Sequence, residues 1–396
     1  MEIRRAEAAD MAAVKALWAY CFEREGDPFF EWYFGRVCRP EDVLLGAENG
    51  QAAASLHLRP YTLSVRGKAL AADYIVGVST HPAARGRGRA GELLRAAFRA
   101  SREAGKSVDI LMPSDASFYY PLGFAFYAHQ WEREASPERL AREGARAVRA
   151  GLTASPDEWR PLAAVYEAHT AGRSGFALRD EASWRRLVEG QLREGRIAVV
   201  EDEAGPAGYL FYSIGDRTLT VSEMACASEA GRRGLYRFMA DHRGSVDLCR
   251  WYEPLDDRSY LFWADGAEHT YIRNRTFPYM MARVTDPAAA FTGLPAETEG
   301  TVSFLYEDGT LPEAGGVYAF RADRGRLEMG KSGDAPAFRL TAAGAAHLLF
   351  GALPAEDLFR FGEAEWLTDG GQERKETLHF LREAFPARRC WISEWY

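Results

Sequence analysis

The segment from Arg85 to Ala90 reads Arg-Gly-Arg-Gly-Arg-Ala, and its residue types suit the capture of an anion. Apolar residues at helical spacing follow directly and predict a helix over about 88–104. The first N–H groups of a helix lack partners inside it, glycines allow close approach of phosphate oxygens, and arginines add charge-assisted hydrogen bonds. We therefore expect a diphosphate at Arg85, Gly86, Arg87, Gly88, Arg89, Ala90 and Gly91. A solvated, arginine-rich turn is the alternative interpretation.

The two common phosphate-binding loops fit this segment less well. A Walker loop needs Gly-Lys followed by Ser or Thr, and no such residues follow here. A Rossmann loop carries its glycines directly after the first strand of its unit, whereas these glycines come after several expected strands.

The other notable segment is the end of the chain, Cys390-Trp391-Ile392-Ser393-Glu394-Trp395-Tyr396. Most termini are polar and frayed, but this one is aromatic, so we expect it to be buried together with the α-carboxylate of Tyr396. Such a carboxyl ordinarily titrates near ~3.5. Desolvation beside aromatic rings, with Glu394 as a like-charged neighbour, would raise this pKa. A solvated carboxylate is the alternative.

The elements around the glycine loop alternate between strands and helices. Strands are expected at 2–5, 43–47, 52–58, 61–66, 69–80 and 108–112, and helices at 8–21 and 88–104. Asn49-Gly50 and Gly67-Lys68 mark two hairpin turns. This order predicts one mixed unit of helices and strands.

Two further units follow. Residues 136–154 are expected to connect them, with some helix, and the second unit begins near Pro156. It repeats the helix, hairpin, strand, helix order but lacks the glycine loop, because its corresponding stretch is Ala225-Cys226-Ala227-Ser228-Glu229-Ala230-Gly231. A third, α+β unit carries Thr341 as the expected N-cap of a helix over 342–350. The predicted domains are 1–150, 151–282 and 283–396.

Composition limits the classes of partner. The 396 residues carry a formal net charge of -8, which argues against nucleic acid and favours small cationic substrates, although solubility alone also explains the charge. No apolar run reaches bilayer length, so we expect no membrane partner and a cytoplasmic location. The five cysteines form no CxxC, and His57, His81 and His129 show no ligand spacing, so we expect no disulfide framework and no metal.

The order of motifs resembles the GNAT superfamily of N-acetyltransferases. Thirty-four positions after Arg85 stands Tyr119, in Phe118-Tyr119-Tyr120-Pro121-Leu122-Gly123-Phe124. A glycine loop, a helix, an apolar strand and then Phe-Tyr-x-x-x-Gly-Phe is the pattern of that superfamily. The full chain further resembles the Eis (enhanced intracellular survival) family. That resemblance implies an α+β, mixed α/β fold of two tandem GNAT-like domains, the second degenerate, followed by a sterol-carrier-protein-like domain.

The resemblance implies acetyl-CoA as the acetyl donor, with its diphosphate on the glycine loop. Its pantetheine would lie between strands 74–79 and 108–113, held by backbone amides at Val76, Gly77 and Val78. The resemblance also places a cofactor contact at Ser114 and Asp115, where a plain turn is an equal alternative. Tyr119 would protonate the departing thiolate, unless it is an ordinary packed tyrosine.

Eis-type enzymes use their own terminal carboxylate as general base, which here is the α-carboxylate of Tyr396. We accordingly expect an N-acetyltransferase that acts on amines of polycationic small molecules, such as aminoglycosides, polyamines or lysine-like compounds. Candidate acceptor contacts are Asp27, Glu31, Trp32 and Glu394, although a solvated helix cap also explains the first three. The resemblance implies hexamers. The alternatives are a non-catalytic acyl-CoA sensor or scaffold, and a lipid carrier that acts through the last domain.

Overall fold

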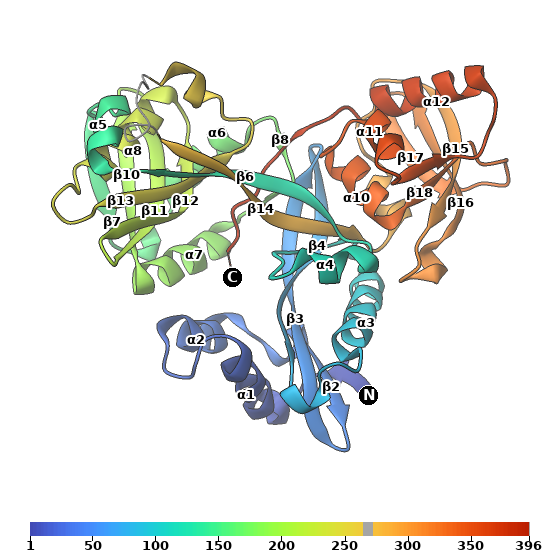
Figure 1. Cartoon of the computed structure of the whole chain (residues 1–396), viewed down its shortest axis with the longest axis horizontal. Helices are drawn as coiled ribbons and strands as arrows, with labels where there is room; N and C mark the ends of the chain where they lie inside the picture. Colours follow the sequence, from blue (N-terminus) through green and yellow to red (C-terminus); the bar gives the residue numbers. More distant parts are fainter. Residues whose placement is uncertain (264–271, 396) are drawn as a thin grey trace.

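The structure is a computed structural model that describes residues 1–263 and 272–395. One large sheet joins the first two thirds of the chain, in the strand order β1-β2-β3-β4-β5-β14-β6-β13-β12-β11-β10-β7, and β9 pairs with β3 beside this path. A separate five-stranded sheet forms the C-terminal part (Figure 1). The predicted mixture of helices and sheets is confirmed.

We call the strands β1–β6 and β14, with their helices, the first lobe. Its elements are β1 (Glu2–Arg5), α1 (Met11–Cys21), α2 (Pro28–Trp32), β2 (Val43–Glu48), β3 (Gln51–Val65), β4 (Lys68–Thr80), α3 (Arg89–Glu103), β5 (Val108–Leu111), α4 (Ala116–Tyr119), β6 (Ala125–Ala135) and β14 (Arg273–Val284). The predicted helix over 88–104 is therefore present as α3. Its buried residues include Leu93, Leu94, Ala97 and Phe98, which form the expected apolar face.

The separate strands predicted at 52–58 and 61–66 are wrong, because β3 runs unbroken through Pro60. β2 pairs with β3 only as far as His57, and β9 pairs with it only at Leu63 and Ser64. Pro60 thus lies in a stretch that has β4 on one side and no strand on the other. A proline is tolerated there because its missing N–H is not needed for a second ladder.

Two long strands connect the lobes. β14 lies between β5 and β6 and pairs with both in antiparallel register, while β6 also pairs with β13 (Leu248–Pro254) of the second lobe. In Figure 1, β6 and β14 run side by side from one lobe into the other. The first lobe is therefore completed by a strand that comes late in the sequence.

The second lobe repeats the fold of the first on the far side of β13. It contains α5 (Pro137–Glu143), β7 (Arg149–Thr153), α6 (Arg160–Thr170), β8 (Arg173–Ser174), β9 (Phe176–Ala177), α7 (Glu181–Glu194), β10 (Arg196–Asp202), β11 (Gly205–Gly215), β12 (Thr218–Cys226) and α8 (Glu229–Ala240). The segment expected to connect the two units holds α5 and also β7, which forms the edge of the large sheet.

The C-terminal domain has the strand order β17-β16-β15-β18-β19. Its elements are α9 (Pro287–Phe291), β15 (Gly300–Glu307), β16 (Gly316–Asp323), β17 (Arg326–Lys331), β18 (Phe338–Thr341), α10 (Ala342–Phe350), α11 (Ala355–Arg360), β19 (Ala364–Trp366) and α12 (Gly371–Ala384). Thr341 caps α10 as predicted, since its hydroxyl accepts a hydrogen bond from the N–H of Gly344. No helix within 1–263 and 272–395 has the length and apolar character to cross a bilayer.

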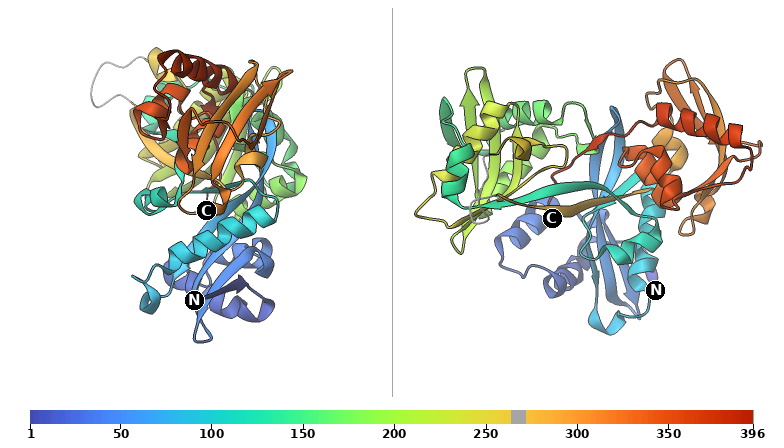
Figure 2. Two further views of the ribbon diagram at one scale, coloured as in Figure 1. Left: turned by 90° about the vertical axis from the view of Figure 1, so that its right-hand side faces the viewer. Right: turned by 45° about the horizontal axis from the view of Figure 1, so that its top comes forward.

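The chain then leaves this domain and returns to the middle of the molecule (Figure 2). β20 (Arg389–Cys390) pairs in parallel with β8 of the second lobe. We call residues 391–395 the tail. Its residues 391–394 are buried, as the aromatic sequence predicted.

Candidate functional site

The glycine loop lies at the start of α3 and opens into a cavity of about 470 Å³. Gly88 is the N-cap residue, with φ +74°, and no side chain caps the helix. Backbone N–H groups at the start of α3 are therefore left for a ligand. This loop cavity is lined by Cys21, Phe22, Val78, Thr80, Ala84, Arg85, Gly86, Gly88, Arg89, Ala90, Gly91 and Phe118.

The loop cavity brings together most of the residues predicted to hold the cofactor. Arg87, Val76 and Gly77 belong to the same loop and strand but do not line it, and neither do Ser114 and Asp115. Cys21, Phe22 and Phe118 line it and were not predicted. Apolar periodicity had marked Cys21 as a helix residue, but nothing in the sequence placed the end of that helix beside the glycine loop.

The arginines of the loop are held by local partners. Arg89 forms ion pairs with Glu48 and with Glu92, and Arg87 approaches Glu48 to 3.9 Å. Arg85 donates from Nε to the carbonyl of Thr80 at 3.2 Å. Glu48 thus holds two guanidinium groups close together at the loop. An incoming phosphate would bind the same two guanidinium groups.

Strands β4 and β5 diverge beside the loop cavity. They pair in parallel only from Ala72 to Tyr74 on β4, and the remainder of β4 has no partner on that side. A bulge interrupts the pairing with β3, since His57 lies opposite Val76 whereas Ser55 lies opposite Ser79. An extra residue in β4 leaves a backbone group outside the ladder. The splay and the bulge lie at the strand predicted to hold pantetheine.

Tyr119 ends the short helix α4, which follows β5. Its side chain is largely buried, and burial followed by the charge of Asp115 raises its pKa to about 12. A phenol with this pKa remains protonated at neutral pH and can donate a proton. Asp115 is the N-cap of α4, because its carboxylate accepts a hydrogen bond from the N–H of Ser117 at 2.9 Å.

The tail is hydrogen-bonded to strands of the large sheet. Gln130 of β6 donates to the carbonyl of Ile392 at 2.7 Å, and the hydroxyl of Tyr74 on β4 donates to the carbonyl of Glu394 at 3.0 Å. Trp395 packs against Tyr279 of β14, with ring centroids 4.8 Å apart. Residue 394 is therefore next to the point where β4 leaves β5. Tyr396 itself lies outside the described residues.

The second lobe holds the tail through Arg179. Its guanidinium binds both oxygens of Glu223 at 2.7 Å and donates from Nε to Glu394 at 2.9 Å. The hydroxyl of Tyr61 donates to the other oxygen of Glu394 at 3.0 Å. Two buried carboxylates thus share one buried guanidinium. Burial raises the pKa of Glu394. No motif or spacing in the sequence indicated that Arg179 belongs to this site.

A cavity of about 640 Å³ lies beside the tail. This tail cavity is lined by Trp32, Val37, Arg59, Pro60, Tyr61, Thr62, Ala177, Leu178, Arg179, Asp180, Ser183, Arg186, Leu187, Glu394 and Trp395. It therefore brings together Trp32 and Glu394 among the candidate acceptor contacts. Asp27 and Glu31 do not line it. Their carboxylates accept hydrogen bonds from the N–H groups of Arg24 and Gly26.

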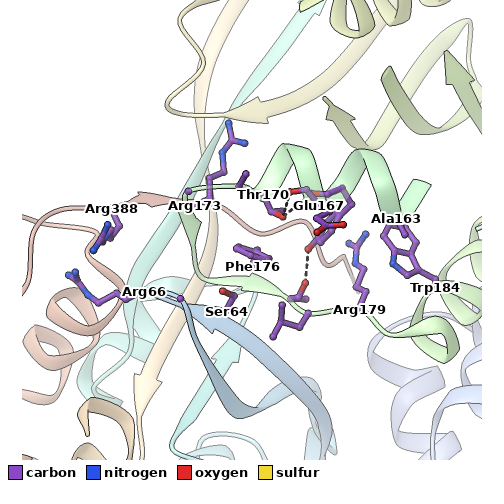
Figure 3. A pocket seen from close by; sticks show the side chains of 16 residues that line it. Ser64, Arg66, Ala163, Glu167, Thr170, Arg173, Phe176, Arg179, Trp184 and Arg388 are labelled. Atoms are coloured by element: carbon purple, nitrogen blue, oxygen red, sulfur yellow. Dashed lines mark hydrogen bonds between the residues drawn. The ribbon is translucent and has the colours of Figure 1, made fainter. Parts of the chain in front are cut away.

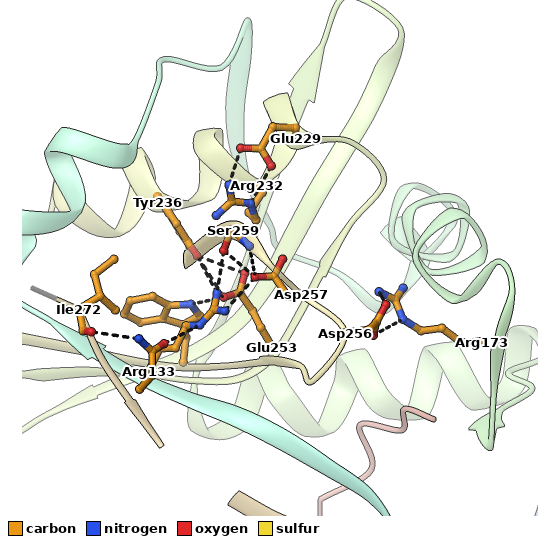
Figure 4. A network of polar contacts seen from close by, with 12 residues as sticks. Arg133, Arg173, Glu229, Arg232, Tyr236, Glu253, Asp256, Asp257, Ser259 and Ile272 are labelled. Carbon is orange, nitrogen blue, oxygen red and sulfur yellow. Dashed lines mark hydrogen bonds and ion pairs between the residues drawn. The ribbon is translucent and has the colours of Figure 1, made fainter. Parts of the chain in front are cut away.

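Among the residues that the structure describes, the second lobe has no comparable loop. Ser228 caps α8, since its hydroxyl accepts from the N–H of Gly231 at 3.0 Å. The cavity at this helix is lined by Glu229, Glu253 and Asp257 and by three arginines, Arg173, Arg232 and Arg389, each of which already pairs with a carboxylate. Arg133 binds Glu253 and Asp257 in the polar network of Figure 4. A capped helix start beside carboxylates is unsuited to a diphosphate.

Comparison with known domain families agrees with this architecture. A family model for the GNAT acetyltransferase domain matches residues 2–127, a second GNAT model matches 175–284, and a model for the sterol carrier protein domain matches 287–393. The chain is an acyltransferase with two GNAT domains. The predicted fold class is thereby confirmed. Proteins of the GNAT fold use acetyl-CoA and act on small-molecule acceptors.

Individual proteins show the same relationship. An uncharacterised N-acetyltransferase of Streptomyces griseus is 25% identical over 306 residues, which cover 70% of this chain and 72% of that protein. Among solved structures, the chain is similar over its full length to GCN5-related N-acetyltransferases of Anabaena variabilis (TM-score 0.83, 17% identity, all of that chain) and Kribbella flavida (0.81, 22%, all of that chain). It is also similar to Eis1 from Mycobacterium abscessus, again over the whole of both chains, with a TM-score of 0.75 and 17% identity.

Proposed function

We propose that the first lobe transfers an acetyl group from acetyl-CoA to a primary amine of a small, polycationic acceptor, in the manner of the Eis family. The observation that carries this proposal is the convergence of the loop cavity, the splayed strands and the tail on one lobe. Bound acetyl-CoA would supply the reactive thioester. The uncapped start of α3 and the arginines of the loop cavity suit its diphosphate, and the β4 bulge suits its pantetheine.

Proton transfers fall to two groups in this proposal. The α-carboxylate of Tyr396 takes a proton from the acceptor ammonium, so that the free amine can attack the thioester carbon. As the carbon–sulfur bond of the donor breaks, the hydroxyl of Tyr119 would give its proton to the sulfur, and the second proton that the attacking nitrogen loses would restore this hydroxyl. Support for Tyr119 is its place directly after Phe118, which lines the loop cavity, and support for Tyr396 is the burial of residues 391–394. The products are an N-acetyl amide and coenzyme A.

The tail cavity is the proposed acceptor site, because it adjoins the tail. Glu23 and Asp27, in the segment between α1 and α2, lie near Glu194 at the end of α7, and burial followed by their charges raises the pKa of Glu194. These acids would attract a cationic acceptor. Arg59 and Arg186 add positive charge to the cavity wall. We therefore expect lysine-like acceptors, which also carry a carboxylate, to be used better than polyamines.

Extending the chain beyond Tyr396 tests the terminal base. A short tag of glycine and serine converts the α-carboxylate into an amide, so we expect turnover to fall at least about 100-fold while acetyl-CoA binds as before. Thiol release measures turnover, and calorimetry measures cofactor binding. The same tag at the N-terminus is the control. Undiminished turnover would exclude Tyr396 as the base, and binding without turnover in the untagged protein would favour the acyl-CoA sensor.

We also propose the domain limits 1–150, 151–282 and 283–396, with β14 supplied to the sheet of the first lobe by the second domain. A cytoplasmic hexamer is the assembly that the Eis resemblance implies. Light scattering on the purified full-length chain would test this assembly.

A further inference from the structure

A third cavity, of about 720 Å³, lies where the two lobes meet the C-terminal domain (Figure 3). We call it the junction cavity. Its lining residues are Ser64, Arg66, Gly67, Ala163, Tyr166, Glu167, Thr170, Ala171, Gly172, Arg173, Phe176, Ala177, Leu178, Arg179, Trp184 and Arg388. It shares Ala177, Leu178 and Arg179 with the tail cavity, but none of the residues proposed for catalysis or cofactor binding lines it.

Two arginines from different domains lie side by side at one end of this cavity (Figure 3). Arg66 comes from the tip of the β3–β4 hairpin, and Arg388 precedes β20. The buried guanidinium of Arg66 donates to the carbonyls of Leu349, Pro386 and Leu348 at 2.8 to 3.0 Å. Across residues 1–263 and 272–395, neither arginine forms an ion pair with a carboxylate. Burial and then the charge of Arg388 lower the pKa of Arg66 to about 9.

The backbone of Arg66 also indicates a constrained position. Its φ is +52° in the hairpin turn, where Asn, Asp or Gly is usual. A bulky residue in this conformation is held by its surroundings. Here the three carbonyls hold the guanidinium, and two of them belong to the last turn of α10.

The other charges around the cavity are already matched. Arg173 pairs with Asp256 at 3.1 Å and points away from the cavity in Figure 3, and Arg179 is bound by Glu223 and Glu394. Glu167 is the single acidic residue among the lining residues, and it is exposed. The unmatched positive charge therefore concentrates at Arg66 and Arg388.

The remaining wall is apolar and aromatic. Phe176 lies in the middle of the cavity, with Trp184 at the end opposite to the two arginines (Figure 3), and Tyr166 also lines it. A ligand that fits must have an oxyanion at one end and an apolar body, because guanidinium forks match oxyanions and aromatic walls bury apolar surface.

We propose that the junction cavity binds a small organic anion, whose carboxylate or phosphate group is held between Arg66 and Arg388. Its aromatic or aliphatic body lies against Phe176 and Tyr166. Neither Arg66 nor Arg388 lines the tail cavity, and the test below measures binding of the anion and not acetyl transfer, so this proposal stands or falls independently of the proposed function.

Calorimetry on the full chain tests this site with three probes: 4-phenylbutyrate, phenyl phosphate and the neutral 4-phenylbutyramide. We expect the anions to bind and the amide not to bind, and the tighter anion identifies the preferred head group. Arg388→Gln should weaken anion binding about tenfold or more, because it removes a charge-assisted contact. Arg389→Gln is the matched control. Arg389 is the adjacent exposed arginine, lies 3.6 Å from Asp256 and does not line the cavity.

Three results would overturn the proposal: equal binding of the amide and the carboxylate, equal loss of affinity in the two variants, or no binding of either anion. Arg66→Lys provides a second variant that retains the positive charge but loses the guanidinium fork. We expect it to weaken binding while the circular dichroism spectrum is kept, and unchanged affinity in it would exclude Arg66 as a ligand.

Discussion

Arg179 is the side chain through which the second lobe contributes to the site of the first. It bridges Glu223 and Glu394 while its guanidinium lies over the ring of Tyr166, 4.3 Å from the centroid. Buried carboxylates are stable only with such partners, so the three charges depend on one another. The lobe without a glycine loop thus fixes the position of the tail.

Glu394→Gln should show this dependence. A glutamine side chain has a single acceptor oxygen, so it cannot accept from both Arg179 and Tyr61 as the carboxylate does. We expect kcat to fall about tenfold because the tail is held less well, with acetyl-CoA affinity within about twofold. Steady-state kinetics and calorimetry measure the two quantities. The control is Glu167→Gln at an exposed position, and equal kcat in the two variants would contradict the role of Glu394.

Asp109 provides a test by pH. It is fully buried on β5 and lies in register with Asp73 on β4 and with Arg283 on β14. Burial, followed by the charge of Asp73, raises the pKa of Asp109 well above its usual value. At a pH between the unfolded and the folded pKa, the folded protein therefore holds a proton that the unfolded chain releases.

The sign of the pH effect follows from the raised pKa. Stability contributed by this proton is complete below the unfolded pKa of about 4 and is lost as pH rises toward the folded value. Asp109→Asn needs no proton, so its stability relative to the native protein should increase with pH. Urea unfolding at about pH 5 and about pH 8 measures the difference. A difference that does not change with pH would show that Asp109 titrates normally.

At the level of elements, the β4 bulge depends on Gly77. Its φ is +61°, and a Cβ atom there would overlap the ring of Trp18. Gly77→Ala should lower the free energy of unfolding by about 2 to 4 kcal/mol and should impair acetyl transfer as the strand shifts. Gly105→Ala is the matched control, because Gly105 has φ +74° with nothing within 4 Å of the added Cβ. Its expected loss is about 1 kcal/mol. Urea unfolding of both variants measures these losses. Equal losses of unfolding free energy in the two variants would mean that the Trp18 ring moves aside for the added Cβ at little cost.

Local sequence signals predicted which helices and strands form better than they predicted which strands pair and which distant side chains meet. The glycine loop, the helix over 88–104 and the cap at Thr341 follow from interactions between neighbouring residues, and all three are present. The position of β14 between β5 and β6 was not predicted, because its strand partners lie more than a hundred residues away. Arg179 was missed for the same reason: its partner Glu394 is 215 residues away.

At the level of the whole molecule, the first lobe should not fold without β14. Residues 279–282 of this strand are fully buried between β5 and β6. The fragment 1–135 lacks both β14 and β13, which leaves β5 unpaired on one side and β6 without any partner, so we expect no cooperative thermal transition. Mixing it with the fragment 136–396, which contains β14, should restore the transition. Circular dichroism melting measures this, and a cooperative melt of 1–135 alone would contradict the expectation.

The two strands that cross between the lobes also constrain how substrates enter. Many two-lobed enzymes open and close by rotation of their lobes about a flexible hinge. Here β6 and β14 pair with each other, β14 also pairs with β5 of the first lobe, and β6 also pairs with β13 of the second lobe. A hinge motion between the lobes would therefore break backbone hydrogen bonds of the sheet. Access to the reaction centre must therefore depend on the movement of side chains and loops on a rigid frame.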